Sequence, residues 1–509
     1  MNRIRNVFAL SLILLLLAVS CAGTSQSGYT PPKKNVTVSL GISTATMRAG
    51  EERTFTPTFK NTDVPPALIW TSSDESILEV DQNGKVTAHN TTSGSLKADI
   101  TAAIADNPNM RSICTVTVLS PTQAHFVTTG PGQNASTQAV ISWHSPDSTS
   151  TLEYTDADGT AFTNTITLEG DPTMSEWADL SFIYRYRVEL GGLLPGSTYR
   201  YRILLSNGTY SETSTFRTAG TDGKFSFAWL SDVHAASADS MGNIERILNY
   251  EEEKTDLDFC LFTGDMVNQG KRYTYWESWT DSGLLSEMTY AFVIGNHEYY
   301  PNKTADKATP SFYLDFTAKP DNSGDSAPAD YWFLYDNVLF ICLDTMASEF
   351  AQTDSGNENL EKQAKWFADV VAENEGRYTY IIVAQHYAFL DADVEGTGYY
   401  LFWYPIFDKY GVDLALASDT HIYSRSKTLY DNKVSDQGTV YMTSPVSEGK
   451  ALDEIINHPE TLGERSAFNA VEKKLGGGSY IEVTPQSLTV HVIGKDGTEY
   501  DSVSIPSRR

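Results

Sequence analysis

Five short apolar segments between residues 224 and 421 each end in side chains that can bind a metal ion. Each segment is rich in β-branched or aromatic residues, which predicts a strand buried on both faces. The carboxyl ends of parallel or mixed strands share one edge of a sheet, where such folds assemble ligand sites. Carboxylate and amide oxygens together with imidazole nitrogens suit two first-row divalent ions. The side chains at these strand ends are Asp232, His234, Asp265, Asn296, His297, His386, Asp419 and His421.

A simpler interpretation is that these are ordinary strand-end turns, where Asp, Asn and Gly are common for conformational reasons. A single histidine at such a position is also more often a hydrogen-bonded structural residue than a ligand. The joint pattern favours the metal site, because four of the nine histidines in the chain lie at these segment ends.

The motifs Asp-x-His, Gly-Asp, Gly-Asn-His-Glu, a lone His and His-x-Tyr-x-Arg resemble those of the calcineurin-like metallophosphoesterases, especially the branch related to purple acid phosphatases. The resemblance covers roughly residues 222–505. It implies that Asp232, His234 and His421 hold one metal ion and that Asp265 bridges to a second. It also implies that Asn296, His386 and residue 419 hold the second ion, and that His297 faces the substrate phosphate.

Two positions depart from that family pattern. Asn268 stands where the purple enzymes carry an iron-binding tyrosine, so we expect no purple chromophore. Asp419 stands where the family has a ligand histidine. A carboxylate still binds a divalent ion but lowers the positive charge of the site, which favours harder ions such as Mn²⁺ or Mg²⁺ relative to Zn²⁺. The alternative is that Asp419 marks a site that has lost activity.

The resemblance implies a phosphoesterase that acts on a small phosphate ester with two divalent ions, which could be Mn, Fe or Zn. The ions would lower the pKa of a water that attacks phosphorus. Asp265 and His297 are the predicted catalytic residues, with His297 protonating or stabilising the leaving oxygen. Glu298 is predicted to orient His297 or a water, and Arg425 to contact phosphate or to form a structural ion pair.

Three functions remain open at this point. The first is an acid phosphatase-like phosphomonoesterase, and the second is a phosphodiesterase or nucleotide hydrolase with the same site. The third is a surface binding protein with weak or no turnover because of Asp419. The natural substrate and the oligomeric state are left open by the residues.

Residues 1–20 contain Arg3 and Arg5 followed by an apolar core too short to span a membrane, which predicts a secretory signal. The ending Leu-Ala-Val-Ser-Cys resembles the lipobox of bacterial lipoproteins, which implies a lipidated Cys21; plain secretion is the alternative. Residues 21–35 are polar and contain Pro and Gly, which predicts a flexible tether. We therefore expect export, with attachment to the cell envelope outside the cytoplasmic membrane through the lipid on Cys21.

Three folded domains are expected beyond the tether. Short alternating segments predict two β-sandwiches, at residues 36–119 and 121–219. The first segment resembles bacterial immunoglobulin-like domains. The second resembles the fibronectin type III-like domain of purple acid phosphatases. Residues 222–509 mix short strands with helical periodicity at 242–254, 359–375 and 401–410, which predicts a layered α/β domain. The family resemblance implies two mixed sheets between helices, with the last three segments closing the second sheet.

The formal net charge is −28, which excludes a general nucleic-acid-binding surface because that needs a basic stripe. Cys114, Cys260 and Cys342 lie inside apolar segments, so we expect small buried thiols and no disulfide. Nine aromatic residues lie near the strand ends and could line a pocket for an aryl or nucleoside group, or could be core. These residues are Trp276, Trp279, Tyr299, Tyr300, Tyr387, Tyr399, Tyr400, Trp403 and Tyr404.

Overall fold

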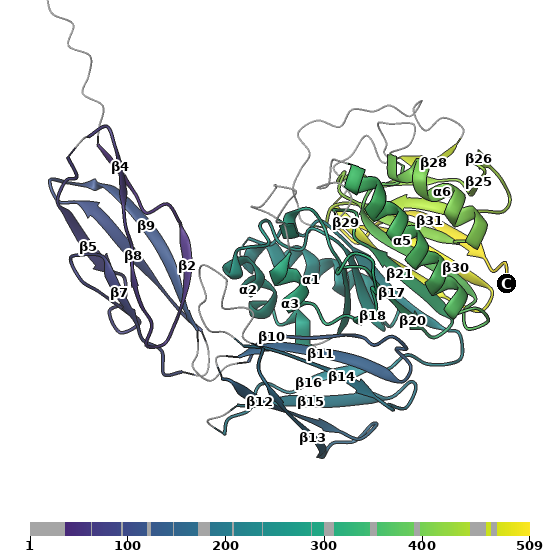
Figure 1. Ribbon diagram of the computed structural model, residues 1–509, viewed down its shortest axis with the longest axis horizontal. Helices are drawn as coiled ribbons and strands as arrows, with labels where there is room; N and C mark the ends of the chain where they lie inside the picture. Colours follow the sequence, from purple (N-terminus) through teal and green to yellow (C-terminus); the bar gives the residue numbers. More distant parts are fainter. Residues whose placement is uncertain are drawn as a thin grey trace, which may run out of the picture.

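The computed structural model places three folded units along the chain (Figure 1). It describes residues 36–62, 64–92, 95–119, 124–145, 147–171, 184–205, 208–236, 238–286, 288–299, 310–346, 354–390, 398–447, 465–469 and 476–509. The predicted signal, Cys21, the tether and Tyr300 lie outside these ranges. Within them, no helix has the length and apolar character needed to cross a bilayer.

The first unit is a β-sandwich, as predicted. Its three sheets have the strand orders β2-β9-β8-β5, β3-β7-β6 and β1-β4. Trp70, Ile100 and Val116 are buried in its core, because alternate residues of the facing strands point inward. Its strands are Thr37–Ser39 (β1), Thr44–Arg48 (β2), Glu52–Thr54 (β3), Thr58–Lys60 (β4), Leu68–Ser72 (β5), Leu78–Val80 (β6), Lys85–Ala88 (β7), Leu96–Ile104 (β8) and Asn107–Leu119 (β9).

The second unit is also an all-β sandwich, with the sheets β10-β11-β14 and β13-β12-β15-β16. Trp143 and Tyr186 stack at 5.2 Å between ring centroids in its core. Its strands are His125–Pro131 (β10), Gln138–Ser145 (β11), Thr149–Thr155 (β12), Phe162–Glu169 (β13), Tyr184–Gly191 (β14), Thr198–Leu204 (β15) and Ser214–Arg217 (β16).

The second unit packs closely on the third. Arg185 forms an ion pair with Asp315 at 2.7 Å, and the Thr128 hydroxyl donates to the Phe316 carbonyl at 3.2 Å. A Cβ atom on Gly130 would lie 1.6 Å from the Ala318 carbonyl oxygen, so only glycine permits this approach. The interface therefore fixes the second sandwich against the domain that carries the predicted site.

The third unit contains two mixed sheets, as the family resemblance implied. Their strand orders are β19-β18-β17-β29-β30-β31 and β20-β21-β22-β23-β27-β24-β28. The strands of the first sheet are Phe225–Leu230 (β17), Phe259–Thr263 (β18), Thr289–Val293 (β19), Gly477–Val483 (β29), Ser487–Gly494 (β30) and Glu499–Pro506 (β31). Those of the second are Tyr331–Tyr335 (β20), Val338–Leu343 (β21), Tyr380–Tyr387 (β22), Leu414–Ser418 (β23), Ser424–Ser426 (β24), Val440–Thr443 (β27) and Ser466–Asn469 (β28), beside the small hairpin Leu429–Tyr430 (β25) and Lys433–Val434 (β26).

Helices cover the outer faces of both sheets (Figure 1). The apolar core between the sheets joins residues such as Phe227 and Phe259 to Phe340 and Leu414. A second core packs the first sheet against its helices, and a third packs the other sheet against α5 and α6. The helices are Ala238–Glu252 (α1), Tyr273–Asp281 (α2), Ser311–Phe316 (α3), Asp354–Glu373 (α5) and Gly398–Tyr410 (α6), with the 3-10 turns Leu284–Ser286 (η2) and His297–Tyr299 (η3).

The three predicted helices in this unit are present as α1, α5 and α6, whereas α2 and α3 were not predicted. These helices have only nine and six residues, which is shorter than the window over which helical periodicity can be recognised. The expectation that the C-terminal strands close the second sheet was wrong. β29 pairs antiparallel with β17, so these strands complete the sheet that carries Asp232 and Asp265.

Candidate metal centre

Parallel strand pairing brings the predicted ligands to one edge of the two-sheet core. β17, β18 and β19 are parallel neighbours in one sheet, and β22 and β23 are parallel neighbours in the other. Five of the predicted ligands have left-handed backbone torsions, which are uncommon outside glycine and concentrate at functional sites. Their φ values are 52° for Asp232, 46° for His234, 52° for Asp265, 72° for Asp419 and 60° for His421.

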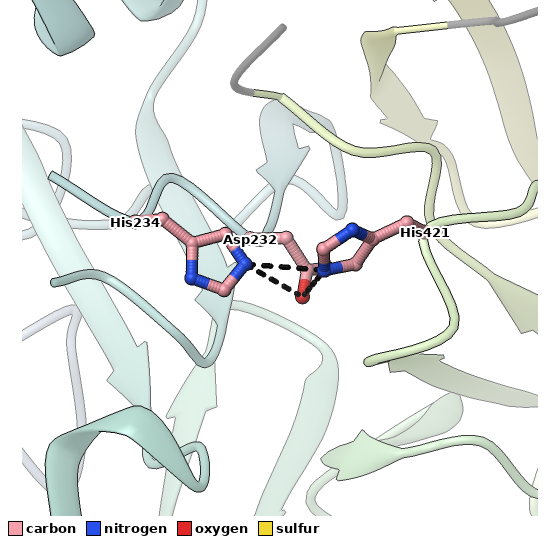
Figure 2. A group of neighbouring side chains, drawn as sticks. All are labelled: Asp232, His234 and His421. Atoms are coloured by element: carbon pink, nitrogen blue, oxygen red, sulfur yellow. Dashed lines mark hydrogen bonds and ion pairs between the residues drawn. The ribbon is translucent and has the colours of Figure 1, made fainter. Parts of the chain in front are cut away.

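Asp232, His234 and His421 converge from two sheets (Figure 2). The Nε2 atoms of His234 and His421 are 3.1 Å apart. The Oδ1 atom of Asp232 lies 3.3 Å from Nε2 of His421 and 4.0 Å from Nε2 of His234. This is a compact group of one oxygen and two nitrogen donors.

A second group surrounds His386. Its Nε2 atom lies 3.1 Å from the Asn296 amide oxygen, 3.2 Å from Oδ1 of Asp265 and 3.6 Å from Oδ1 of Asp419. The other oxygen of Asp265 lies 3.8 Å from Nε2 of His234. Asp265 therefore stands between the two groups, where the family resemblance put the bridging ligand.

Hydrogen bonds to main-chain carbonyls fix two of the imidazoles. The Nδ1 atom of His386 is 2.7 Å from the Thr263 carbonyl oxygen, and that of His297 is 2.8 Å from the Asn268 carbonyl oxygen. An N–H donated at Nδ1 leaves the Nε2 lone pair of the neutral ring facing the site, as metal-binding histidines require. Sequence reasoning missed both carbonyls, since a main-chain acceptor leaves no trace in residue type.

His297, which was predicted to face the substrate phosphate, also lies next to two of the candidate metal ligands. Its Nε2 atom is 3.7 Å from Oδ2 of Asp265, and its ring is 4.4 Å from that of His234. These three residues form a further group able to hold an ion. The His297 side chain is 19% exposed, so it also forms part of the mouth of the site.

The buried charges perturb one another strongly. Burial alone would raise the pKa of Asp265, but His386, His297 and His234 outweigh it and hold that pKa below its usual range. Burial likewise opposes protonation of His386, yet Asp265 and Asp232 raise its pKa well above normal. Burial, together with Asp232 and Asp265, raises the pKa of Asp419 to about 6. The site therefore stabilises positive charge among its carboxylates.

The residues fit a pair of divalent ions. The Asp232 carboxylate is buried, and its closest side-chain partner is the His421 imidazole at 3.3 Å, so a bound cation would offset the cost of burying this anion. The two groups mix carboxylate and amide oxygens with imidazole nitrogens, a donor set used for first-row divalent ions. The assignment of individual ligands to individual ions remains a prediction.

Glu298 binds main-chain groups, which the sequence did not predict. Its carboxylate accepts main-chain N–H groups from Asp265, Met266, Val267 and Gly295, at 3.0, 2.9, 3.2 and 2.8 Å. Burial, helped by the nearby Asp265 charge, raises its pKa to about 8, while these hydrogen bonds act in the opposite direction. Glu298 thus ties the loop after β18 to the loop after β19.

Arg425 forms the structural ion pair that was one of its two predicted roles. Its Nε and Nη2 atoms bind the two carboxylate oxygens of Asp501 at 2.7 and 3.0 Å, and Tyr423 donates to the same carboxylate at 2.7 Å. Because β24 and β31 belong to different sheets, this pair links the two sheets. The geometry favours an ion pair over phosphate contact.

Comparison with known proteins agrees with this geometry. Residues 225–423 match the family of calcineurin-like phosphoesterases, and residues 121–218 match the N-terminal domain of purple acid phosphatases. Residues 225–423 are a calcineurin-like phosphoesterase domain. The resemblance inferred from the strand-end motifs and from the second sandwich is therefore confirmed.

The relatives of this metallophosphoesterase are distant. An uncharacterized protein of Mycobacterium tuberculosis is 22% identical over 58% of this chain, and the chain spans only 61% of that relative. Tartrate-resistant acid phosphatase type 5 of Oryctolagus cuniculus is 24% identical over 54% of this chain and 84% of its own length. The solved purple acid phosphatase from yellow lupin (Lupinus luteus) seeds shares the fold, with a TM-score of 0.62 at 17% identity over 83% of this chain and 82% of that one.

Replacing Glu298 with Gln should loosen the metallophosphoesterase site without removing a ligand. An amide has one acceptor oxygen, so at least two of the four main-chain donors would lose their partner, at about 1–3 kcal/mol each. We expect the free energy of unfolding of metal-free protein to fall by at least about 2 kcal/mol and metal affinity to fall about 10–100-fold. Denaturant unfolding and metal titration measure both. Glu373→Gln on the exposed face of α5 is the control, and equal behaviour of the two variants would contradict this role.

Replacing Asp419 with His should change which ions the site retains. The group around His386 would then have one oxygen fewer and one nitrogen more, which favours Zn²⁺ over Mn²⁺. In protein equilibrated with both ions, we expect the bound Mn²⁺ to Zn²⁺ ratio to fall about tenfold relative to the unchanged chain. Elemental analysis measures the ratio, and Asp436→His on an exposed turn is the control. An unchanged ratio would show that Asp419 is no ligand.

Replacing either Arg425 or Asp501 with Ala should destabilise the fold to a similar degree. Each change leaves a largely buried charge without its partner, which costs on the order of 3 kcal/mol. Thermal or denaturant unfolding measures the loss, and the double variant should lose little more than either single one. If only the Arg425 variant raised KM for a phosphate ester, the phosphate-contact role would be correct instead.

Proposed function

We propose that this chain is a metal-dependent phosphoester hydrolase of the cell envelope. The observation that carries the proposal is the position of Asp265, whose two oxygens face one donor group each, at 3.2 Å from His386 and 3.8 Å from His234. Two divalent ions bound there would supply Lewis-acid stabilisation of phosphoryl oxygens and a water of lowered pKa. The predicted signal and the lipobox-like Cys21 support the envelope location.

The protein side chains have separate roles in the proposed reaction. Asp232, Asp265 and Asp419 would hold the cations, and their negative charges attract the neighbouring imidazoles. His297 is anchored at Nδ1 by the Asn268 carbonyl, so its Nε2 atom is the one that exchanges a proton with the ester. It lies at the exposed mouth, where a leaving oxygen can reach it. General acid catalysis of this kind contributes about 10²–10⁴-fold to a rate.

Phosphomonoesters are the first candidate substrates, in keeping with the acid phosphatases among the relatives. Phosphodiesters are the second, because a specific observation favours them. The Asp419 carboxylate lies 3.6 Å from His386 and adds a negative charge to the site. Three carboxylates facing two divalent ions lower the net positive charge of the site. A dianionic monoester loses more electrostatic attraction from that change than a monoanionic diester does.

Hydrolysis of matched aryl mono- and diesters by protein loaded with Mn²⁺, Fe²⁺ or Zn²⁺ tests the proposal. We expect His297→Ala to lower kcat about 10²–10⁴-fold while bound metal stays within a factor of two, because the ring moves a proton in the reaction. Asp265→Asn should lower both together, since that carboxylate faces both groups. Equal loss of metal and activity in the His297 variant would make His297 a ligand. No hydrolysis by metal-loaded protein, with turnover recovered in Asp419→His, would show a binding protein instead.

A further inference from the structure

The structure describes eight of the nine aromatic residues predicted near the strand ends and separates them into core and site. Trp276, Trp279 and Trp403 are at most 1% exposed, inside the cores that pack helices on the sheets. Tyr299 is 6% exposed and donates its hydroxyl to Asp344 at 2.6 Å. Tyr387 is half-buried and packs against the edge of the core that contains Trp276 and Trp279, and its ring also lies beside a candidate metal ligand.

A shift in strand register accompanies the approach of the Tyr387 ring to His386. Consecutive side chains of a regular strand point to opposite faces of the sheet. The pairing of β22 with β23 shifts register between Ala384 and Tyr387, and the rings of His386 and Tyr387 lie 5.8 Å apart, tilted by 32°. Bulges of this kind redirect side chains beside active sites. Tyr387 therefore accompanies His386 to the edge where the ligands converge.

Tyr399 supports this ring from the start of α6. The two tyrosine rings are 5.9 Å apart, and the Tyr399 hydroxyl donates to the Thr345 carbonyl at 3.1 Å, which orients it. The half-buried candidate ligands at the same edge are all polar, namely Asn296, His297, Asp419 and His421. Tyr387 thus gives this polar mouth an aromatic face.

We propose that Tyr387, held by Tyr399, stacks on a ring in the alcohol part of the ester. The site would then prefer phosphate esters of aromatic or nucleoside alcohols over those of plain sugars or alkyl alcohols, an inference that rests on the proposed hydrolase function. Aromatic rings stack at centroid distances of about 4.5–7 Å, the range already seen between the rings at this edge. Stacking tolerates any base, since every base has a π-face.

Adenosine 5′-monophosphate and ribose 5-phosphate form a matched substrate pair, because both release a primary alcohol and they differ in the base. The ratio of their kcat/KM values is measured with metal-loaded protein. We expect the unchanged chain to favour the nucleotide, and Tyr387→Leu to lower the ratio about tenfold. Tyr387→Trp should keep the ratio, because an indole also stacks. Tyr404→Leu is the matched control, since that ring stacks on Tyr400 at 5.2 Å within the α6 core.

Each outcome separates this inference from the proposed function. A ratio near one in the unchanged chain, or a ratio that Tyr387→Leu leaves intact, overturns the stacking role while hydrolysis itself still stands. A fall in bound metal that accompanies the Tyr387 variant would show that the ring supports His386 structurally, which also overturns it. Hydrolysis of neither compound by metal-loaded protein overturns the hydrolase function, and the inference with it.

Discussion

The buried carboxylate of Asp265 is the constraint around which the site is organised. An anion removed from water is costly unless cations and hydrogen-bond donors surround it. Here three imidazoles approach its oxygens, and the main-chain N–H of His297 donates to it at 2.9 Å. Divalent ions would complete that compensation and would also compensate the buried carboxylate of Asp232. The need to compensate these buried carboxylates thus accounts for the raised pKa of His386, and it explains why the site suits metal ions.

The two sheets and the loops that follow their strands position the charged side chains of the site. Parallel strands end together, but the ligands reach one another only through left-handed backbone turns at Asp232, His234, Asp265, Asp419 and His421. Such conformations cost energy and persist when their surroundings hold them. Glu298 provides part of that support by accepting four main-chain donors from two loops, and the Arg425–Asp501 pair ties the sheets to each other.

The second sandwich contributes to the same rigidity from outside. It contacts the helices and loops that follow β19 through Arg185 and Asp315 and through the close approach at Gly130. The fold shared with the purple acid phosphatase from yellow lupin covers 83% of this chain, which is more than the third unit alone. The second sandwich therefore helps to fix the strand ends of the third unit, although it contains no predicted ligand itself.

The sequence by itself determined which side chains stand at the strand ends, the sandwich character of the first two units and the family of the third. These features are encoded locally, in segments of a few residues whose apolar runs, turns and motifs need no distant partner. Tertiary structure alone decided that Arg425 binds Asp501, that Glu298 binds main-chain N–H groups, that the last strands join the first sheet and that the ring of Tyr387 lies 5.8 Å from that of His386. Those outcomes depend on pairing between residues far apart in the chain, on strand register and on a single bulge, none of which residue types and local spacing specify.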